Sequence, residues 1–168
     1  MKKSMLPLAM LALIACPGSH AADGRGYEKQ SVKMDCGTAR YTLTSTCIQS
    51  GDLTTLNECK PQTLSVDNAG AKRSTTLPEL PKALSAEIRA ARGGLGELFV
   101  ISWACSKTGA GPIATLHYSI GGGSAAYGEA WANYDKAGNL IVKDLKLTPA
   151  EIDATQRNLK RVPSIMPE

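Results

Sequence analysis

The sequence predicts a mainly β protein of the α+β class, built as an antiparallel β-sandwich or partly open barrel of about seven or eight strands. Three observations support this class. Short segments of strand character recur along the chain, turn-forming residues separate them, and helix signals occur once in mid-chain and once near the C-terminus. We therefore expect one β-rich domain with a short mid-chain helix and a C-terminal helix packed on it.

The strand candidates share period-two alternation or a short apolar run, bounded by Gly, Pro, Asn or Asp. They are residues 29–36, 40–48, 62–66, 72–77, 97–105, 113–120, 126–134 and 140–145. Residues 97–105 are the most apolar of these segments, which predicts a central strand buried on both faces. Turn chemistry predicts hairpins at residues 67–70 and 135–139, because Asn, Asp and Gly accept the positive φ of tight turns.

Aromatic residues are concentrated in the second half of the domain. Six of the eight lie between residues 99 and 134, and they are Phe99, Trp103, Tyr118, Tyr127, Trp131 and Tyr134. Because large aromatic side chains bury the most apolar area, these strands are expected to form the centre of the core.

The mid-chain helix is expected over residues 86–92. Ser85 is placed to cap its first turn, and Gly93 with Gly94 is placed to end it.

The C-terminal helix has a clearer start signal. Thr148 and Glu151 form a capping box around Pro149, which loses no hydrogen bond at the first helical position. The helix is expected to run to about Lys160, with Ile152 among the residues that face inward.

The N-terminal residues have the three parts of a secretion signal. Lys2 and Lys3 precede an apolar run over residues 4–14. Ser19 and Ala21 then place small residues at the two positions that a signal peptidase recognises. The apolar run is shorter than the roughly 20 residues that a membrane-spanning helix needs. We therefore expect cleavage of residues 1–21, a single disulfide-bonded domain over residues 22–168 that is periplasmic or secreted, and no membrane span.

A second processing route stays open, because Leu13-Ile14-Ala15-Cys16 matches a bacterial lipobox. In that case the signal comprises residues 1–15, and a lipidated Cys16 anchors the protein to the membrane as a lipoprotein.

The cysteines agree with export. Four of them follow the signal, namely Cys36, Cys47, Cys59 and Cys105, and an even number in an oxidising compartment indicates two disulfides. Three pairings are open. We favour Cys47–Cys59, which closes a short loop, with Cys36–Cys105, which ties the start of the domain to its middle. No C-x-x-C pair is present to suggest a thioredoxin-type or zinc site.

The charge balance gives no support to nucleic-acid binding. The formal net charge is +4, and it falls to +2 when Lys2 and Lys3 are removed. The basic dipeptides Lys72-Arg73 and Lys160-Arg161 are interpreted as solvated surface, since no basic stripe accompanies them.

His117 is the only histidine after the signal, and it lies on the strand face opposite Leu116 and Tyr118. Histidine is the usual general acid–base group, but a G-x-S-x-G motif fails at Ala126, and the chain has no H-E-x-x-H pattern. We therefore interpret His117 as a partly exposed strand residue and expect no metal, no cofactor and no histidine-based catalytic site.

Glu129 alternates with Tyr127 and Trp131 on one face of its strand. A carboxylate between aromatic rings is suited to contact sugar or peptide, and two carboxylates together can hydrolyse a glycan. An outward-facing surface residue is the other interpretation of Glu129.

The connection formed by residues 121–127 is the main binding candidate. It lacks the lysine of a phosphate-binding loop and joins two strands, which favours a flexible or protruding hairpin end. The stretch Gly-Gly-Gly-Ser-Ala-Ala-Tyr resembles the small-residue loop ending in tyrosine of periplasmic lysozyme inhibitors, which are also small exported β proteins. The resemblance covers these seven residues and implies a loop inserted into the cleft of a partner protein.

Together these observations favour an exported bacterial envelope protein that acts as a non-enzymatic protein-binding module of the inhibitor or immunity type. The expected partner is another envelope protein, and the expected binding residues are Gly122, Gly123, Ser124, Tyr127, Glu129 and Trp131. Two alternatives remain: a carboxylate-based hydrolase of cell-wall or other glycans, and a structural envelope lipoprotein anchored through Cys16.

The intact mass of the native protein distinguishes the two processing routes. We expect a chain that begins at Ala22, because small residues precede that bond as a signal peptidase requires. A mass that corresponds to a diacylglyceryl group on Cys16 would contradict this expectation and establish the lipoprotein.

Overall fold

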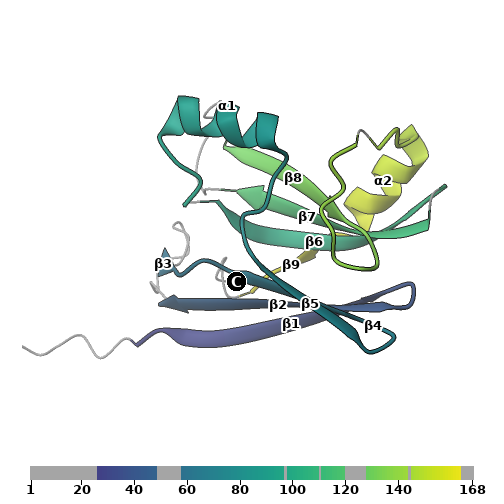
Figure 1. Cartoon of the computed structure of the whole chain (residues 1–168), viewed down its shortest axis with the longest axis horizontal. Coiled ribbons are helices and arrows are strands. Elements are labelled where there is room, and N and C mark those ends of the chain that lie inside the picture. The colour runs from purple at the N-terminus through teal and green to yellow at the C-terminus, as the bar shows by residue number, and fades with distance from the viewer. Residues whose placement is uncertain are drawn as a thin grey trace, which may run out of the picture.

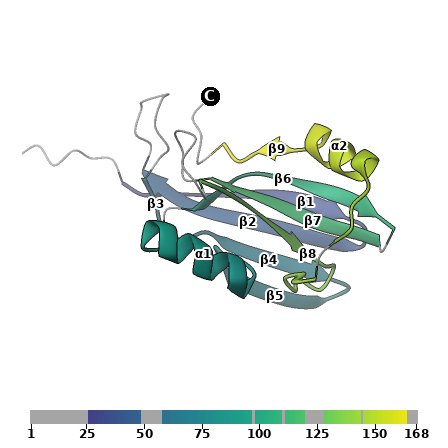
Figure 2. The same ribbon diagram turned by 90° about the horizontal axis from the view of Figure 1, so that it is seen from above.

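The computed structural model describes residues 26–48, 58–96, 98–109, 111–119, 128–143 and 145–163. These residues form two antiparallel sheets packed face to face, together with two helices (Figures 1 and 2). The expected mainly β, sandwich-like α+β fold is therefore confirmed. The predicted signal and Cys16 lie outside the described residues.

Sheet 1 comprises the N-terminal strands and sheet 2 the C-terminal strands. Sheet 1 contains β1 (Glu28–Cys36), β2 (Ala39–Ile48), β3 (Glu58–Cys59), β4 (Thr63–Asn68) and β5 (Ala71–Thr76), in the order β1-β2-β4-β5 with β3 beside β2. Sheet 2 contains β6 (Phe99–Thr108), β7 (Gly111–Ser119), β8 (Glu129–Tyr134) and β9 (Lys160–Arg161), in the order β8-β7-β6-β9. The helices are α1 (Lys82–Arg92) and α2 (Pro149–Arg157).

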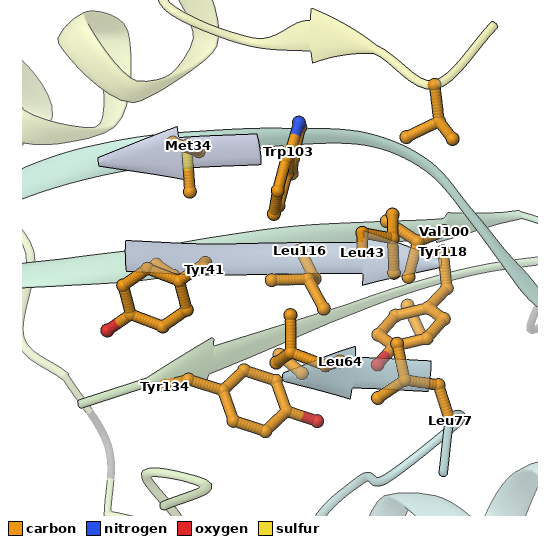
Figure 3. Packing of buried hydrophobic residues seen from close by; sticks show 14 of the residues in the cluster. Met34, Tyr41, Leu43, Leu64, Leu77, Val100, Trp103, Leu116, Tyr118 and Tyr134 are labelled. Carbon is orange, nitrogen blue, oxygen red and sulfur yellow. The ribbon is translucent and has the colours of Figure 1, made fainter. Parts of the chain in front are cut away.

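The core lies between the two sheets, where the alternate residues of each strand meet (Figure 3). Its largest fully buried side chains include Trp103, Tyr41, Tyr118, Tyr134, Leu43, Leu64 and Leu116. Two core tyrosines donate to backbone carbonyls: Tyr41 to Asp135 at 2.7 Å and Tyr134 to Glu79 at 3.2 Å. Burial raises the pKa of Tyr41 to about 12.

One aromatic residue departs from the expected core. Trp131 lies on the opposite face of sheet 2 and is 40% exposed, because its strand alternates Ala130, Ala132 and Tyr134 toward the core instead. Tyr127 lies outside the described residues.

The favoured disulfide pairing is confirmed. Cys36–Cys105 joins β1 of sheet 1 to β6 of sheet 2, and Cys47–Cys59 joins β2 to β3. Their sequence separations of 69 and 12 residues correspond to about 4 and about 3 kcal/mol of loop-closure stabilisation. The longer bridge therefore ties the two layers together.

The predicted hairpin at residues 67–70 is confirmed. Ala69 and Gly70 have φ of 51° and 86°, so both central turn residues are left-handed, as a tight hairpin between twisted strands requires.

Strand β6 contains an irregularity that its apolar sequence did not predict. Val100 pairs with Tyr118, but the next pair is Ser102 with His117, so Ile101 is an extra residue in the ladder. Such a bulge changes which side chains face each side of the strand. Trp103 therefore points into the core, and Ser102 points to the outer face of sheet 2.

A buried glutamine holds the chain next to this bulge. Gln62, 1% exposed, accepts from the Val100 N–H at 2.6 Å and donates to the Val100 carbonyl at 3.2 Å and to Ser45 Oγ at 2.9 Å. On the other side, the Val162 N–H donates to the Ile101 carbonyl at 2.9 Å. Polar contacts between the layers therefore satisfy the irregular backbone.

The mid-chain helix starts earlier than predicted. It begins at Lys82 with Pro81 as N-cap, and Ser85 lies inside it. Pro81 makes no side-chain cap hydrogen bond, and the cap predicted at Ser85 does not form because Ser85 Oγ donates to the Leu80 carbonyl at 3.3 Å. The left-handed Gly93 ends the helix as expected, and Ile88 is its fully buried contact with the core.

The capping box of Thr148 and Glu151 is confirmed, but α2 ends at Arg157. Lys160 instead pairs with Trp103 in β9, because pairing with the open edge of β6 satisfies its backbone. The expectation that Ile152 faces inward was wrong, since it is 42% exposed. The outer face of sheet 2 offers hydroxyl groups beneath α2, and Thr155 is the residue that turns toward them.

In the described part of the predicted strand at residues 140–145, which leaves out residue 144, one bridge forms, between Leu140 and Tyr134. The turn before it forms as expected, with the Asp135 carboxylate accepting from the N–H groups of Ala137 and Asn139. Ile141 is the last residue bonded to β8, through its N–H to the Asn133 carbonyl, and residues 145–148 lead into α2 (Figure 2). Within the described residues, neither helix is long and apolar enough to cross a membrane.

Replacement of Gln62 by alanine should lower the free energy of unfolding by about 2–4 kcal/mol, because it leaves two buried backbone groups of Val100 unpaired. Urea unfolding of the oxidised protein measures the change. Gln30→Ala, at a partly exposed position of β1, is the control and should cost less than about 1 kcal/mol. Equal losses of unfolding free energy in both variants would show that the hydrogen bonds from Gln62 to Val100 do not stabilise the fold.

Candidate functional site

The candidate site is built on the outer face of sheet 2, where three neighbouring strands place polar and aromatic side chains in one row. Ser102 on β6 is the cross-strand partner of His117 on β7, and His117 is the partner of Trp131 on β8. Directly opposed residues of antiparallel strands lie close enough for their side chains to touch.

His117 and Trp131 form a parallel aromatic stack. Their ring centroids are 4.1 Å apart and their planes differ by 7°. The histidine side chain is 14% exposed, whereas Trp131 is 40% exposed. The histidine therefore forms a support beneath a tryptophan that remains open to solvent.

Polar contacts at both ring nitrogens hold His117 in place. Ser102 Oγ lies 3.2 Å from Nδ1, and the Glu129 Oε2 atom lies 3.5 Å from Nε2. Among the described residues Nε2 has no hydrogen-bond partner, so the contact with Glu129 is electrostatic. The hydroxyl of Ser102 can donate to or accept from Nδ1, and in either case the contact restrains rotation of the imidazole ring.

The order serine, histidine, glutamate invites comparison with a hydrolase triad. A nucleophilic serine needs an exposed Oγ beside a space for the substrate. Ser102 is 8% exposed, its Oγ faces Nδ1, and neither Ser102 nor His117 lines the adjoining groove. The arrangement is therefore suited to orient the histidine ring, and through it Trp131.

A groove of about 270 Å³ adjoins the exposed tryptophan, between sheet 2 and α2. Its lining residues are Thr115, Trp131, Asn133, Leu147, Ile152, Thr155 and Gln156. The groove combines an aromatic ring, two aliphatic side chains, hydroxyls and amides, and no charged side chain lines it.

Hydrogen bonds fix the floor of the groove. Thr155 on α2 donates to Ser106 Oγ at 2.9 Å, and Ser106 lies 2.7 Å from the hydroxyl of Thr115. Thr115 in turn donates to Asn133 Oδ1 at 2.8 Å. These bonds join α2, β6, β7 and β8, so the groove is held by a connected polar network.

The structure places part of the predicted site. Glu129 and Trp131 share the outer face of β8 as expected, with Glu129 exposed. Gly122, Gly123, Ser124 and Tyr127 lie outside the described residues.

The contributions of Ser102 and Ile152 were not predicted from the sequence. Ser102 could not be predicted as the partner of His117, because a strand without the bulge would place Ile101 opposite His117. Ile152 was assigned to the core by helical periodicity alone, although it is one of the few large apolar side chains that remain exposed.

The carboxylate-pair interpretation finds no support in this groove, because no aspartate or glutamate lines it. The described part of the chain also contains no cluster of three or more His, Cys, Asp or Glu that could hold a metal ion.

No family model, curated protein or solved structure matches this chain.

A double-mutant cycle tests whether the two stacked rings act as a unit. We expect His117→Ala and Trp131→Ala to show a coupling free energy of about 1 kcal/mol in urea unfolding, which is typical of aromatic pairs. The same cycle in a Ser102→Ala background should give a smaller coupling, because the imidazole loses its fixed orientation. A coupling indistinguishable from zero would show that the rings do not support one another.

Proposed function

We propose that this protein is an exported bacterial envelope protein and a non-enzymatic protein-binding module of the inhibitor or immunity type. The proposal is carried by one observation, the solvent-exposed Trp131 stacked on His117 beside the uncharged groove.

The composition of this surface favours a protein partner. The centres of protein interfaces are enriched in aromatic residues and depleted of charge, and tryptophan is among the residues that contribute most to binding. Trp131 and Ile152 both line the groove and are 40% and 42% exposed, which gives the surface two apolar anchors.

The stacking of Trp131 on His117 is also relevant to affinity. An exposed side chain that is ordered only on binding costs roughly 0.5–1.5 kcal/mol of conformational entropy. The stacking of Trp131 on His117 orders the ring in the free protein. A partner therefore meets a preorganised aromatic surface.

The compartment is supported less directly. Two disulfides are compatible with an oxidising environment such as the periplasm or the outside of the cell. The secretion signal read from residues 1–21 points to the same compartment.

The proposal is tested by capturing partners from envelope and secreted extracts with the purified, oxidised protein, followed by a binding titration of any retained protein. We expect one stoichiometric partner whose affinity falls at least about tenfold with Trp131→Ala, because truncation of a central tryptophan costs more than about 1 kcal/mol.

Two variants complete this experiment. Trp131→Phe retains an aromatic face and should recover part of the affinity. Val142→Ala, at an apolar position that is 67% exposed and outside the groove, is the matched control and should leave the affinity within about twofold. Unchanged binding by Trp131→Ala, or an equal loss with Val142→Ala, would rule out this surface as the binding site.

A further inference from the structure

The outer face of sheet 1 has a chemistry unlike that of sheet 2. Residues of β1, β2, β4 and β5 that point away from the core are hydroxyl-bearing or charged, apart from Ile48 at the end of β2. Both helices lie on the other side of the molecule, so within the described residues no helix or strand covers this face (Figure 1).

Strand register arranges these residues in three rows that run across the sheet. The rows are Ser31-Thr44-Thr63-Thr76, Lys33-Thr42-Ser65-Ser74 and Asp35-Arg40-Asp67-Lys72. We call these twelve residues the polar face. Neighbouring strands are about 4.8 Å apart and alternate residues about 7 Å apart, so the hydroxyls form a regular grid.

Part of the polar face is hollowed. A concavity of about 460 Å³ is lined by Lys33, Arg40 and Lys72 of the polar face, with Asp67 as its one acidic lining residue; Arg73 also lines it but donates to Asn139 Oδ1 at 2.7 Å. The excess of cations arises only in the folded chain, because these residues come from β1, β2 and β5.

The existing contacts leave cationic groups available. Arg40 pairs with Asp35 at 2.8 Å, and both side chains are more than half exposed. Lys72 lies 3.9 Å from Asp67 and remains 78% exposed. Exposed pairs of this kind contribute little to stability, so a ligand anion can replace them at small cost.

We infer that the polar face is a second binding surface, for a polysaccharide that carries acidic groups. The cations around the concavity complement carboxylate, sulfate or phosphate substituents. The serine and threonine hydroxyls both donate and accept hydrogen bonds, which matches the hydroxyl groups of sugar rings.

The same residues disfavour other partners. None of the twelve residues of the polar face is aromatic, and the exposed ring of Tyr27, which precedes β1, already has the Lys60 ammonium 4.5 Å from its centroid. Stacking on aromatic rings dominates the binding of single strands. The apolar anchors typical of protein interfaces are found on sheet 2 instead.

The inference is tested by comparing two carboxylate polymers of matched length, polygalacturonate and poly-L-glutamate, in titrations of the purified, oxidised protein at fixed ionic strength. The two carry the same acidic group, and only the first carries sugar hydroxyls. We expect polygalacturonate to bind at least about tenfold more tightly, a difference of about 1.4 kcal/mol that comes from hydrogen bonds to the sugar hydroxyls.

Matched variants separate the two kinds of contact. Lys33→Gln with Lys72→Gln should weaken polygalacturonate binding by about tenfold, because two cations facing the polymer are lost. Lys82→Gln with Arg89→Gln on α1 removes the same net charge elsewhere and should change it by less than about twofold. Thr42→Val with Ser65→Ala and Ser74→Ala should reduce the preference over polyglutamate by about fivefold or more.

Equal affinities for polygalacturonate, polyglutamate and single-stranded DNA would overturn the inference and indicate unspecific attraction of anions. The inference would also be overturned if the double variant on α1 lost as much affinity for polygalacturonate as the double variant of Lys33 and Lys72. Trp131→Ala should leave polysaccharide binding unchanged, so this surface and the proposed protein-binding site can fail independently.

Discussion

The extra residue that β6 carries at Ile101 decides which side chains reach each face of sheet 2. It turns Trp103 into the core and Ser102 to the outside, where it meets His117. A bulge is stable only where its irregular backbone finds partners, and here Gln62 pairs with both polar groups of Val100 while Val162 pairs with Ile101. The core and the outer surface of sheet 2 are therefore set by one feature, which is held by a residue of the opposite layer.

The side chains on the outer face of sheet 2 hold one another in place. Ser102 fixes the ring of His117, the ring supports Trp131, and the hydroxyl network from Ser106 to Asn133 fixes the groove beside it. Each step places a more exposed group on a less exposed one. A side chain that is ordered before binding loses less entropy on binding, which is the basis of the role proposed for Trp131.

The two outer faces of the sandwich differ in chemical composition and in what covers them. The face of sheet 2 is crossed by α2 and presents an aromatic and aliphatic groove, whereas the face of sheet 1 is uncovered and presents hydroxyls and cations. Alternation along a strand allows this, because the residues that face outward are not restricted by the packing of the core. The Cys36–Cys105 bridge links the two layers that carry these faces.

Local features could be predicted from the sequence: the alternating strands, the left-handed turn at Gly70, the capping box at Thr148 and the short loop closed by Cys47–Cys59 each depend on residues close together in the chain. The alternation also placed Glu129 and Trp131 on one face. The partners of those residues could not be predicted in this way. The contact of Ser102 with His117 depends on a bulge, the exposure of Ile152 on a polar docking surface for α2, and the grouping of Lys33 with Lys72 on strand order. All three result from long-range pairing, and the pattern of polar and apolar residues along a strand does not encode which strand lies beside it.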